Sequence, residues 1–384
     1  MKTFINEIVE LYHSKYSHDP LSTGIITPNR RAHRFIKQAI IDSSPTGGFM
    51  PNISSIDDFI FQHIPLVRID EVDLTYLLFE TFLDQKEEKN LDFDDFLSYA
   101  SILLHDFNEI DLQLANGKAI FSYLNDAKAI QQWNPDGSPL SPSQKEYLRF
   151  YNQLAYVYTE FKDRLLSKQL CYQGMGYRYF VEHLDEILTE IPWKKMIFAG
   201  FNALTKSEEF ILKSLYRKGI TAIIWDADSY YLNDEMMEAG MYLRKYQSWH
   251  TNIKEQAKSH FLNQKKKIQI TGTPGVLGQA KIAGQIITNN SELDDPKLAK
   301  QDQFINNTVI VPADENLLLP ILNSLPKNIL ESTNITMGFP IQHSHAYRLA
   351  ESLIKLHLHS SRMNQLNDQT ARYHKDDLME VWNN

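Results

Sequence analysis

The chain has 384 residues, of which 43% are hydrophobic and 23% charged, a composition that favours a folded protein with two or three domains. Its net charge of −9 argues against a protein coated in basic surface, so any contact with DNA must be confined to a local stripe or groove. No apolar run approaches the ~18 residues of a membrane helix, and the acidic, amphipathic first residues lack the pattern of a secretory signal. The single cysteine, Cys171, suits a reducing compartment, and we expect a cytoplasmic protein without membrane contact.

A first α/β layer is predicted at the beginning of the chain. Residues 3–16 have a helical pattern, and residues 23–27 (TGIIT) that of a short buried strand, which Pro28 and Asn29 end. A helix then opens at Arg30, and its apolar residues follow the i, i+3, i+4, i+7, i+8 spacing of one buried face: Ala32, Phe35, Ile36, Ala39 and Ile40. Further along, Ser55 followed by Asp57 and Asp58 predicts the capped start of another helix.

A long helical block then interrupts the α/β pattern. From about residue 70 to 190 the apolar residues keep a helical period, and strand-like segments return only at 195–200 and 221–225. A helical segment separates these two strands. If the block is an insertion into one domain, residues 23–27 and 195–200 must lie in the same sheet.

A second α/β stretch begins near Lys266. Three strand-like segments, KIQIT, NTVIVP and NITM, alternate with two helical ones, QAKIAGQIIT and ENLLLPILNSL. The last segment, ARYHKDDLMEVWNN, has a helical pattern without a capping signal, and we expect the second domain to be truncated.

The predicted fold class is therefore α/β, with two parallel-sheet domains and an all-helical insertion in the first. The first domain is predicted to consist of residues 1–65 and 190–262, the helical insertion of 66–189, and the second domain of 263–384.

Motifs for nucleotide hydrolysis are incomplete. The best match to a phosphate-binding loop, GTPGVLGQ at 272–279, follows a strand-like segment but lacks the lysine and the magnesium-binding hydroxyl. Its glycines suit an anion-binding backbone nest, although a plain strand-to-helix turn is the commoner explanation. Asp226 and Asp228 follow a strand-like segment, where a metal-binding carboxylate would stand, and without a phosphate loop we interpret them as loop residues.

Metal and nuclease motifs are also missing from the pattern. Two histidine pairs have i, i+2 spacing, which points the side chains apart on a helix, whereas zinc sites favour i, i+4; we expect solvated histidines at 343, 345, 357 and 359. Two acidic clusters, at 92–95 and 106–111, are interpreted as a helix cap and a polar face. We therefore expect no catalytic residue, cofactor or metal ion in this chain.

One basic stripe remains. Arg30, Arg34 and Lys37 follow i, i+4, i+7 spacing, with Arg31 beside them, on a helix face other than the apolar one. A solvated charged face is the common explanation of such spacing. However, the stripe stands where a strand turns into a helix, and ligands of open α/β sheets collect at the carboxyl ends of strands. These four residues are the candidate DNA-binding residues.

Ten phrases, in this order, resemble the AddB-like family of the Bacteroidetes type, which is described as an inactivated superfamily I helicase fused to a nuclease. They are IITPNRRAHRF (25–35), ISSIDDF (53–59), LLHDFNEIDLQL (103–114), LCYQGMGYR (170–178), FAGFNALTKSEE (198–209), IIWDADSYY (223–231), EAGMYLR (238–244), GQAKIAGQII (278–287), VPADENLLLPILNSLP (311–326) and NITMGFP (334–340). The similarity runs nearly from end to end, and the order of the phrases is more specific than any one of them.

The resemblance implies two RecA-like (P-loop NTPase-like) domains, with the helical insertion in the first. It also implies a longer protein with a carboxy-terminal PD-(D/E)XK nuclease domain, whose motifs are absent from this sequence, and a partner, an AddA-like helicase–nuclease subunit. The phosphate loop and carboxylate of active relatives are missing, which argues against motor activity. The PNRR segment stands where such helicases contact single-stranded DNA, a role that the resemblance extends to Arg30 and Arg31.

Three hypotheses follow. The leading one is a non-catalytic scaffold that binds DNA and a helicase–nuclease partner in double-strand-break repair, as part of a DNA exonuclease. The alternatives are a divergent ATP-dependent DNA helicase and a module that binds only proteins.

Overall fold

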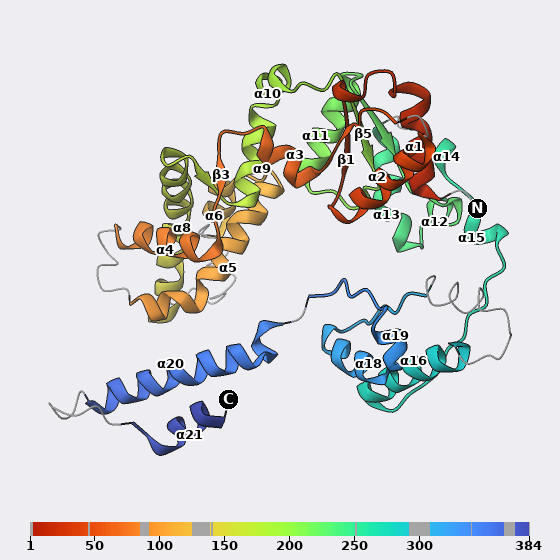
Figure 1. Ribbon diagram of the computed structural model, residues 1–384. Helices are drawn as coiled ribbons and strands as arrows, with labels where there is room; N and C mark the ends of the chain where they lie inside the picture. The colour runs from red at the N-terminus through yellow and green to blue at the C-terminus, as the bar shows by residue number, and fades with distance from the viewer. Residues whose placement is uncertain are drawn as a thin grey trace. The chain divides into compact units, whose positions relative to one another are not determined.

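Four short parallel strands form the sheet in the amino-terminal part of the chain (Figure 1). They lie in the order β2-β1-β5-β6 and are β1 (Thr23–Thr27), β2 (Asn52–Ser55), β5 (Lys195–Ala199) and β6 (Thr221–Ile224). The computed structural model describes residues 3–44, 47–84, 92–124, 139, 141–249, 252–291, 308–338, 340–364 and 373–383. The chain divides into two compact units, Met1–Lys265 and Lys266–Asn384, and this sheet belongs to the first.

The central strand pair joins segments that are far apart in the sequence. β1 and β5 pair in parallel, with Ile25 opposite Ile197 and Ile26 opposite Phe198. The two segments that an inserted helical block must bring together are therefore neighbours in one sheet. β2 is a strand that the sequence analysis missed, because its NISS sequence holds only one apolar residue.

Side chains alternate between the two faces of this sheet, and helices cover both faces. On one face Ile25 and Ile197 pack in a cluster with α1 (Phe4–Lys15) and α2 (Arg31–Ser43). On the other, Ile26 and Phe198 pack in a larger cluster with α3 (Ile56–Gln62) and α11 (Lys206–Arg217). Figure 1 shows α2 and α11 on opposite sides of β1 and β5.

The prediction for the buried face of α2 is wrong in one residue. Ile36 and Ile40, one turn apart, are buried against the sheet and α1, as expected. Phe35 was expected to join them, but 62% of it is exposed. One residue turns the helix by about 100°, and the face that meets the sheet is narrow enough to be filled by the two isoleucines and their neighbours.

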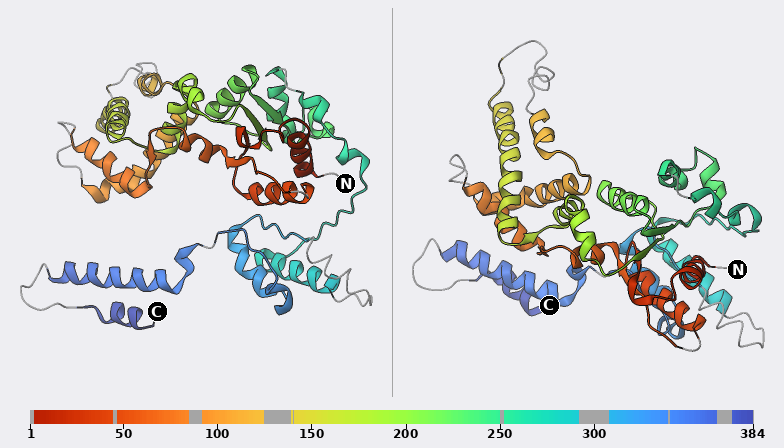
Figure 2. Two further views of the ribbon diagram at one scale, coloured as in Figure 1. Left: turned by 45° about the horizontal axis from the view of Figure 1, so that its top comes forward. Right: turned by 90° about the horizontal axis from the view of Figure 1, so that it is seen from above.

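The helical block belongs to the same unit and extends from the sheet to one side (Figures 1 and 2). Asp70 and Asp92 cap the first turns of its first two helices through backbone N–H groups of residues 73 and 94. The block is not purely helical, because β3 (Val67–Arg68) pairs in parallel with β4 (Leu170–Cys171). Its helices are α4 (Glu71–Leu83), α5 (Phe93–Leu112), α6 (Gly117–Leu124), α8 (Pro142–Ser167), α9 (Gln173–Glu182) and α10 (Leu184–Glu190).

After β6, the fully buried Trp225 stacks on Tyr246. Short helices complete the first unit. They are η1 (Pro20–Ser22) before β1 and, after β6, α12 (Ser229–Asn233), η2 (Glu238–Gly240), α13 (Met241–Tyr246), η3 (Gln247–Trp249), α14 (Ile253–Gln256) and α15 (His260–Asn263).

All the regular secondary structure described for the second unit is helical. Two small clusters form its core, one around Ala280 and Ile321 and one around Ile287 and Ile329. Its elements are α16 (Gly275–Ser291), η4 (Glu315–Leu317), α18 (Leu318–Ser324), α19 (Lys327–Leu330), η5 (Ile341–His343), α20 (His345–Asn364) and α21 (Lys375–Asn383).

The strands predicted for this unit are not formed. Residues 267–271, 308–312 and 334–337 take no part in any ladder in the described part of the chain, and Asn307 of the second segment lies outside it. Ile270 and Val311 are 93% and 83% exposed. A segment rich in β-branched residues forms a strand only when a neighbouring strand accepts and donates its backbone hydrogen bonds. The described residues supply no such strand to these segments. A second parallel sheet is therefore not part of the described fold.

Candidate nucleic-acid interface

The four parallel strands end at one edge of the sheet, and the polar loops of the first unit meet there. The chain leaves β1 through α2 towards β2, and leaves β5 through α11 towards β6. These connections run over opposite faces and in opposite directions along the sheet. The strand order therefore reverses between β1 and β5, and open α/β sheets bind their ligands in the crevice at such a point.

The turn after β1 is held by its own polar side chains. The Thr27 hydroxyl donates a hydrogen bond to the carbonyl of Asn29 at 2.8 Å, and the Asn29 side-chain oxygen accepts one from the backbone N–H of Arg31 at 3.0 Å. The His33 ring lies 3.0 Å from the Thr27 hydroxyl across the same turn. Pro28 ends the strand because it has no N–H to donate. This short TPNRRAH sequence therefore fixes the direction in which α2 leaves the edge.

Arg30 is paired with a carboxylate. It precedes the first residue of α2 and makes two hydrogen bonds to Asp58 of α3, one of them from its Nε at 2.8 Å. Ser55, the capping residue of α3, donates to the same carboxylate at 2.7 Å. Hydrogen bonding to the Arg30 guanidinium holds the pKa of Asp58 well below its usual range. Of the four predicted residues, Arg30 is thus the one whose charge is compensated within the fold.

The other three predicted residues lie on the exposed side of α2. Among the residues that the structure describes, no carboxylate lies within ion-pair distance of Arg31, Arg34 or Lys37. The exposed ring of Phe35 stands one helical turn after Arg31. The helix therefore presents three uncompensated cations and one aromatic ring on an otherwise acidic protein. Sequence periodicity placed Phe35 in the core, so its presence on this surface is visible only in the structure.

Asp226 and Asp228 lie at the same edge, after β6, and both have structural partners. Asp228 caps α12 through the N–H of Tyr230 at 2.9 Å and accepts a second hydrogen bond from the N–H of Phe261 at 3.0 Å. Asp226 lies 3.5 Å from the amino group of Lys258, which also pairs with Glu7 at 2.9 Å. Their placement agrees with the interpretation as loop residues that end a strand.

Other candidates from the sequence lie in the second unit. Gly275, within the glycine-containing segment, opens α16 with a φ of 65° and so forms a turn into a helix. His345, His357 and His359 are exposed, as expected of solvated histidines, and His359 also forms a hydrogen bond of 2.9 Å to Asp377 of α21. The described residues hold no cluster of three metal-ligating side chains.

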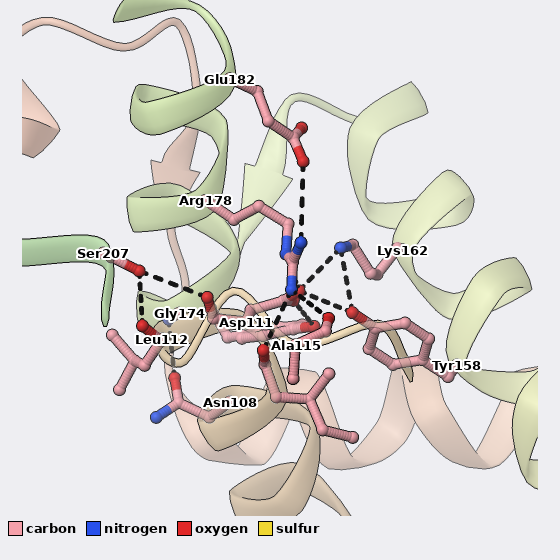
Figure 3. A network of polar contacts seen from close by, with 12 residues as sticks. Asn108, Asp111, Leu112, Ala115, Tyr158, Lys162, Gly174, Arg178, Glu182 and Ser207 are labelled. Carbon is pink, nitrogen blue, oxygen red and sulfur yellow. Dashed lines mark hydrogen bonds and ion pairs between the residues drawn. The ribbon is translucent and has the colours of Figure 1, made fainter. Parts of the chain in front are cut away.

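A buried carboxylate, Asp111, joins three segments of the helical block (Figure 3). It was expected on a polar face but is fully buried. Its side chain accepts hydrogen bonds from α8, α9 and the residue before α9, which come from Tyr158 at 2.6 Å, Lys162 at 2.9 Å, Tyr172 and Arg178. Burial beside this carboxylate raises the pKa of Tyr158 far above its usual value, so the hydroxyl remains a donor. At the end of α5, Ser207 of α11 donates to the carbonyl of Leu112 at 2.6 Å.

Asp57 forms a second junction between the block and the sheet domain. Its carboxylate accepts hydrogen bonds from Gln173 at 3.1 Å and Tyr177 at 3.4 Å, both on α9, and pairs with Arg68 at 3.2 Å. The neighbouring Asp58 holds Arg30. Two successive carboxylates at the start of α3 therefore tie the turn that carries α2 to the helical block.

No helix in the described ranges is both long and apolar enough to cross a membrane. No protein-family model matches the chain, and no curated protein matches it.

Proposed function

We propose that this chain is the non-catalytic, helicase-like body of an AddB-like DNA-repair protein. It binds single-stranded DNA through the exposed side of α2 and works in the cytoplasm with an AddA-like helicase–nuclease subunit in double-strand-break processing. The nuclease chemistry belongs to a further carboxy-terminal domain, as the sequence resemblance implies. The proposal includes RecA-like folds for both units; the parallel sheet with helices on both faces supports this for the first unit, and for the second it rests on the sequence resemblance alone.

The observation that carries the proposal is the group of three uncompensated cations, Arg31, Arg34 and Lys37, beside the reversal point of the sheet. A protein with a net charge of −9 repels a polyanion, so binding needs a site where cations are not neutralised by neighbouring carboxylates. Side chains on the outer face of a helix contact phosphates more readily than base edges. The contacts should therefore be insensitive to sequence and strongly dependent on salt.

A fluorescence anisotropy titration with labelled oligo(dT) over a salt series tests this proposal. The variant Arg31→Ala, Arg34→Ala, Lys37→Ala should bind single strands more weakly, and the slope of log K against log salt should fall by about 2, since each lost phosphate contact removes roughly 0.7. The control removes three positive charges at the opposite edge of the sheet, before β5 and β6, by Lys194→Ala, Arg217→Ala and Lys218→Ala. This control variant has the same net charge as the α2 variant, but its slope of log K against log salt should equal that of the parent protein.

Two results would contradict the proposal. One is an unchanged affinity and slope in the folded α2 variant, and the other is an equal loss in the control. A chain that binds no DNA at any salt concentration would support the alternative of a module that binds only proteins.

The enzyme alternative, a divergent ATP-dependent helicase, is tested by phosphate release with and without single-stranded DNA. We expect no turnover, because neutralising the developing charge of a transferred phosphoryl group requires a lysine and a magnesium-bound hydroxyl that the segment 272–279 does not supply. DNA-stimulated turnover that a point substitution in this chain abolishes would favour the helicase.

A further inference from the structure

The least expected surface residue of the first unit is Phe35. It is 62% exposed, whereas its neighbour Ile36 is completely buried. It stands one helical turn after Arg31, so the ring lies next to that guanidinium group at the edge of the basic side of α2. The core of the first unit is complete without it, because Ile36 and Ile40 fill the contact with the sheet and α1.

We infer that Phe35 is a stacking platform for an unpaired base, and that it makes the α2 surface selective for single-stranded over double-stranded nucleic acid. The inference rests on the proposed function and names the residue that sets its substrate class. Cations that hold successive phosphates bring the attached bases close to the helix. An aromatic ring at the edge of these cations offers one of the bases a flat apolar face, and such stacking tolerates any base because every base has a π-face.

The same ring adds nothing to duplex binding. The bases of a duplex are stacked on one another and hidden behind the two backbones, so Phe35 has no free base face to meet. Arg31, Arg34 and Lys37 attract both forms by charge. The ring is thus the part of the surface that distinguishes the two, and its contribution should not depend on salt.

The test compares Phe35→Leu with a matched control, Phe49→Leu. Leucine keeps an apolar side chain and removes the aromatic face. Phe49 is 75% exposed but lies in the loop between the carboxyl end of α2 and β2, at the other end of the helix. Affinity is measured for a single strand and for a hairpin duplex at three salt concentrations, and the fluorescence of 2-aminopurine in the strand reports stacking directly.

Phe35→Leu should weaken single-strand binding by about 5- to 150-fold, with the salt slope and the duplex affinity unchanged. It should also remove the change in 2-aminopurine fluorescence on binding. Phe35→Trp should restore both signals, and Phe49→Leu should bind like the parent protein.

Three outcomes would overturn the inference. In the first, Phe35→Leu binds normally while the α2 charge variant (Arg31→Ala, Arg34→Ala, Lys37→Ala) binds weakly. The proposed function then stands, and Phe35 is not a stacking platform. In the second, single-strand and duplex binding fall equally. In the third, Phe35→Leu melts several degrees lower and binds weakly, which assigns the ring to packing within the chain. If neither the charge variant nor Phe35→Leu changes binding, the proposed function fails as well.

Discussion

Aspartates with similar sequence surroundings have different tasks in this chain. Asp92 caps α5, Asp58 neutralises Arg30, and Asp111 is buried against two cations. The cap formed by Asp92 can be predicted from the sequence, because the N–H group that it accepts from belongs to a residue only two positions along the chain. The role of Asp111 does not, since Lys162 and Arg178 come from helices far along the chain and meet it only in the folded structure. An acidic cluster in a sequence therefore predicts a cap better than a buried junction.

The Asp111 junction should be among the most sensitive positions of the first unit. Asp111→Asn removes a negative charge that Lys162 and Arg178 share at this buried point, and breaking a buried ion pair in this way costs about 3–5 kcal/mol. The matched control is Asp84→Asn, which breaks the pair between Arg164 and an Asp84 side chain that is 65% exposed; such pairs contribute about 0–1 kcal/mol. Urea unfolding at neutral pH measures both losses. Equal effects of the two substitutions would contradict the role assigned to Asp111.

At the scale of elements, periodicity predicted best where an element contacts one partner along its whole length. The strand 23–27 was predicted with its observed bounds, and those at 195–200 and 221–225 to within a residue, because each is an apolar run between polar turns. In the second unit the same signal at 267–271 predicted a strand that does not form, since propensity specifies no partner. The outward position of Phe35 was missed for a related reason: the width of a helix's contact face depends on what it packs against.

The crossing of α5 and α9 provides a test in which local propensity and packing have opposite signs. Alanine favours a helix over glycine by about 1 kcal/mol, so propensity alone predicts that Gly174→Ala stabilises α9. However, a Cβ at Gly174 would lie 2.2 Å from the backbone carbonyl oxygen of Asn108 on α5, an atom that moves only with its helix. We expect a net destabilisation, since overpacking costs about 1–3 kcal/mol.

The control for Gly174→Ala is Gly48→Ala. Gly48 lies in a loop with no atom within 4 Å of the added Cβ, so this substitution should be neutral or slightly stabilising. Thermal melting of both variants measures the difference. A Gly174→Ala variant that melts at or above the parent temperature would show that the helices separate at little cost.

At the scale of the whole molecule, the boundary between the two units coincides with a run of lysines. The sequence analysis placed the end of the first domain at 262, and the structure separates the units between Lys265 and Lys266. The expectation rested on a change of pattern along the chain, because a polar stretch there separates two sets of alternating strand-like and helical segments. What the sequence could not supply is the set of side-chain contacts, such as Tyr177 of α9 with Asp57 of α3, that join the helical block to the sheet.

Limited trypsin digestion should therefore cut first at Lys265–Lys267. These residues are exposed and lie outside any helix or strand, so the backbone can enter a protease site without unfolding either unit. Cys171 then reports whether the first unit survives the cut. Burial raises the pKa of its thiol to about 12, so at pH 8 it should react with a disulfide reagent only when this unit opens. We expect a stable product that ends near residue 265, with Cys171 as slow to react as in the intact chain and fast in urea. First cleavage within the helical block would contradict the expected cleavage site, and fast labelling of Cys171 after the cut would show that the first unit depends on the second for its stability.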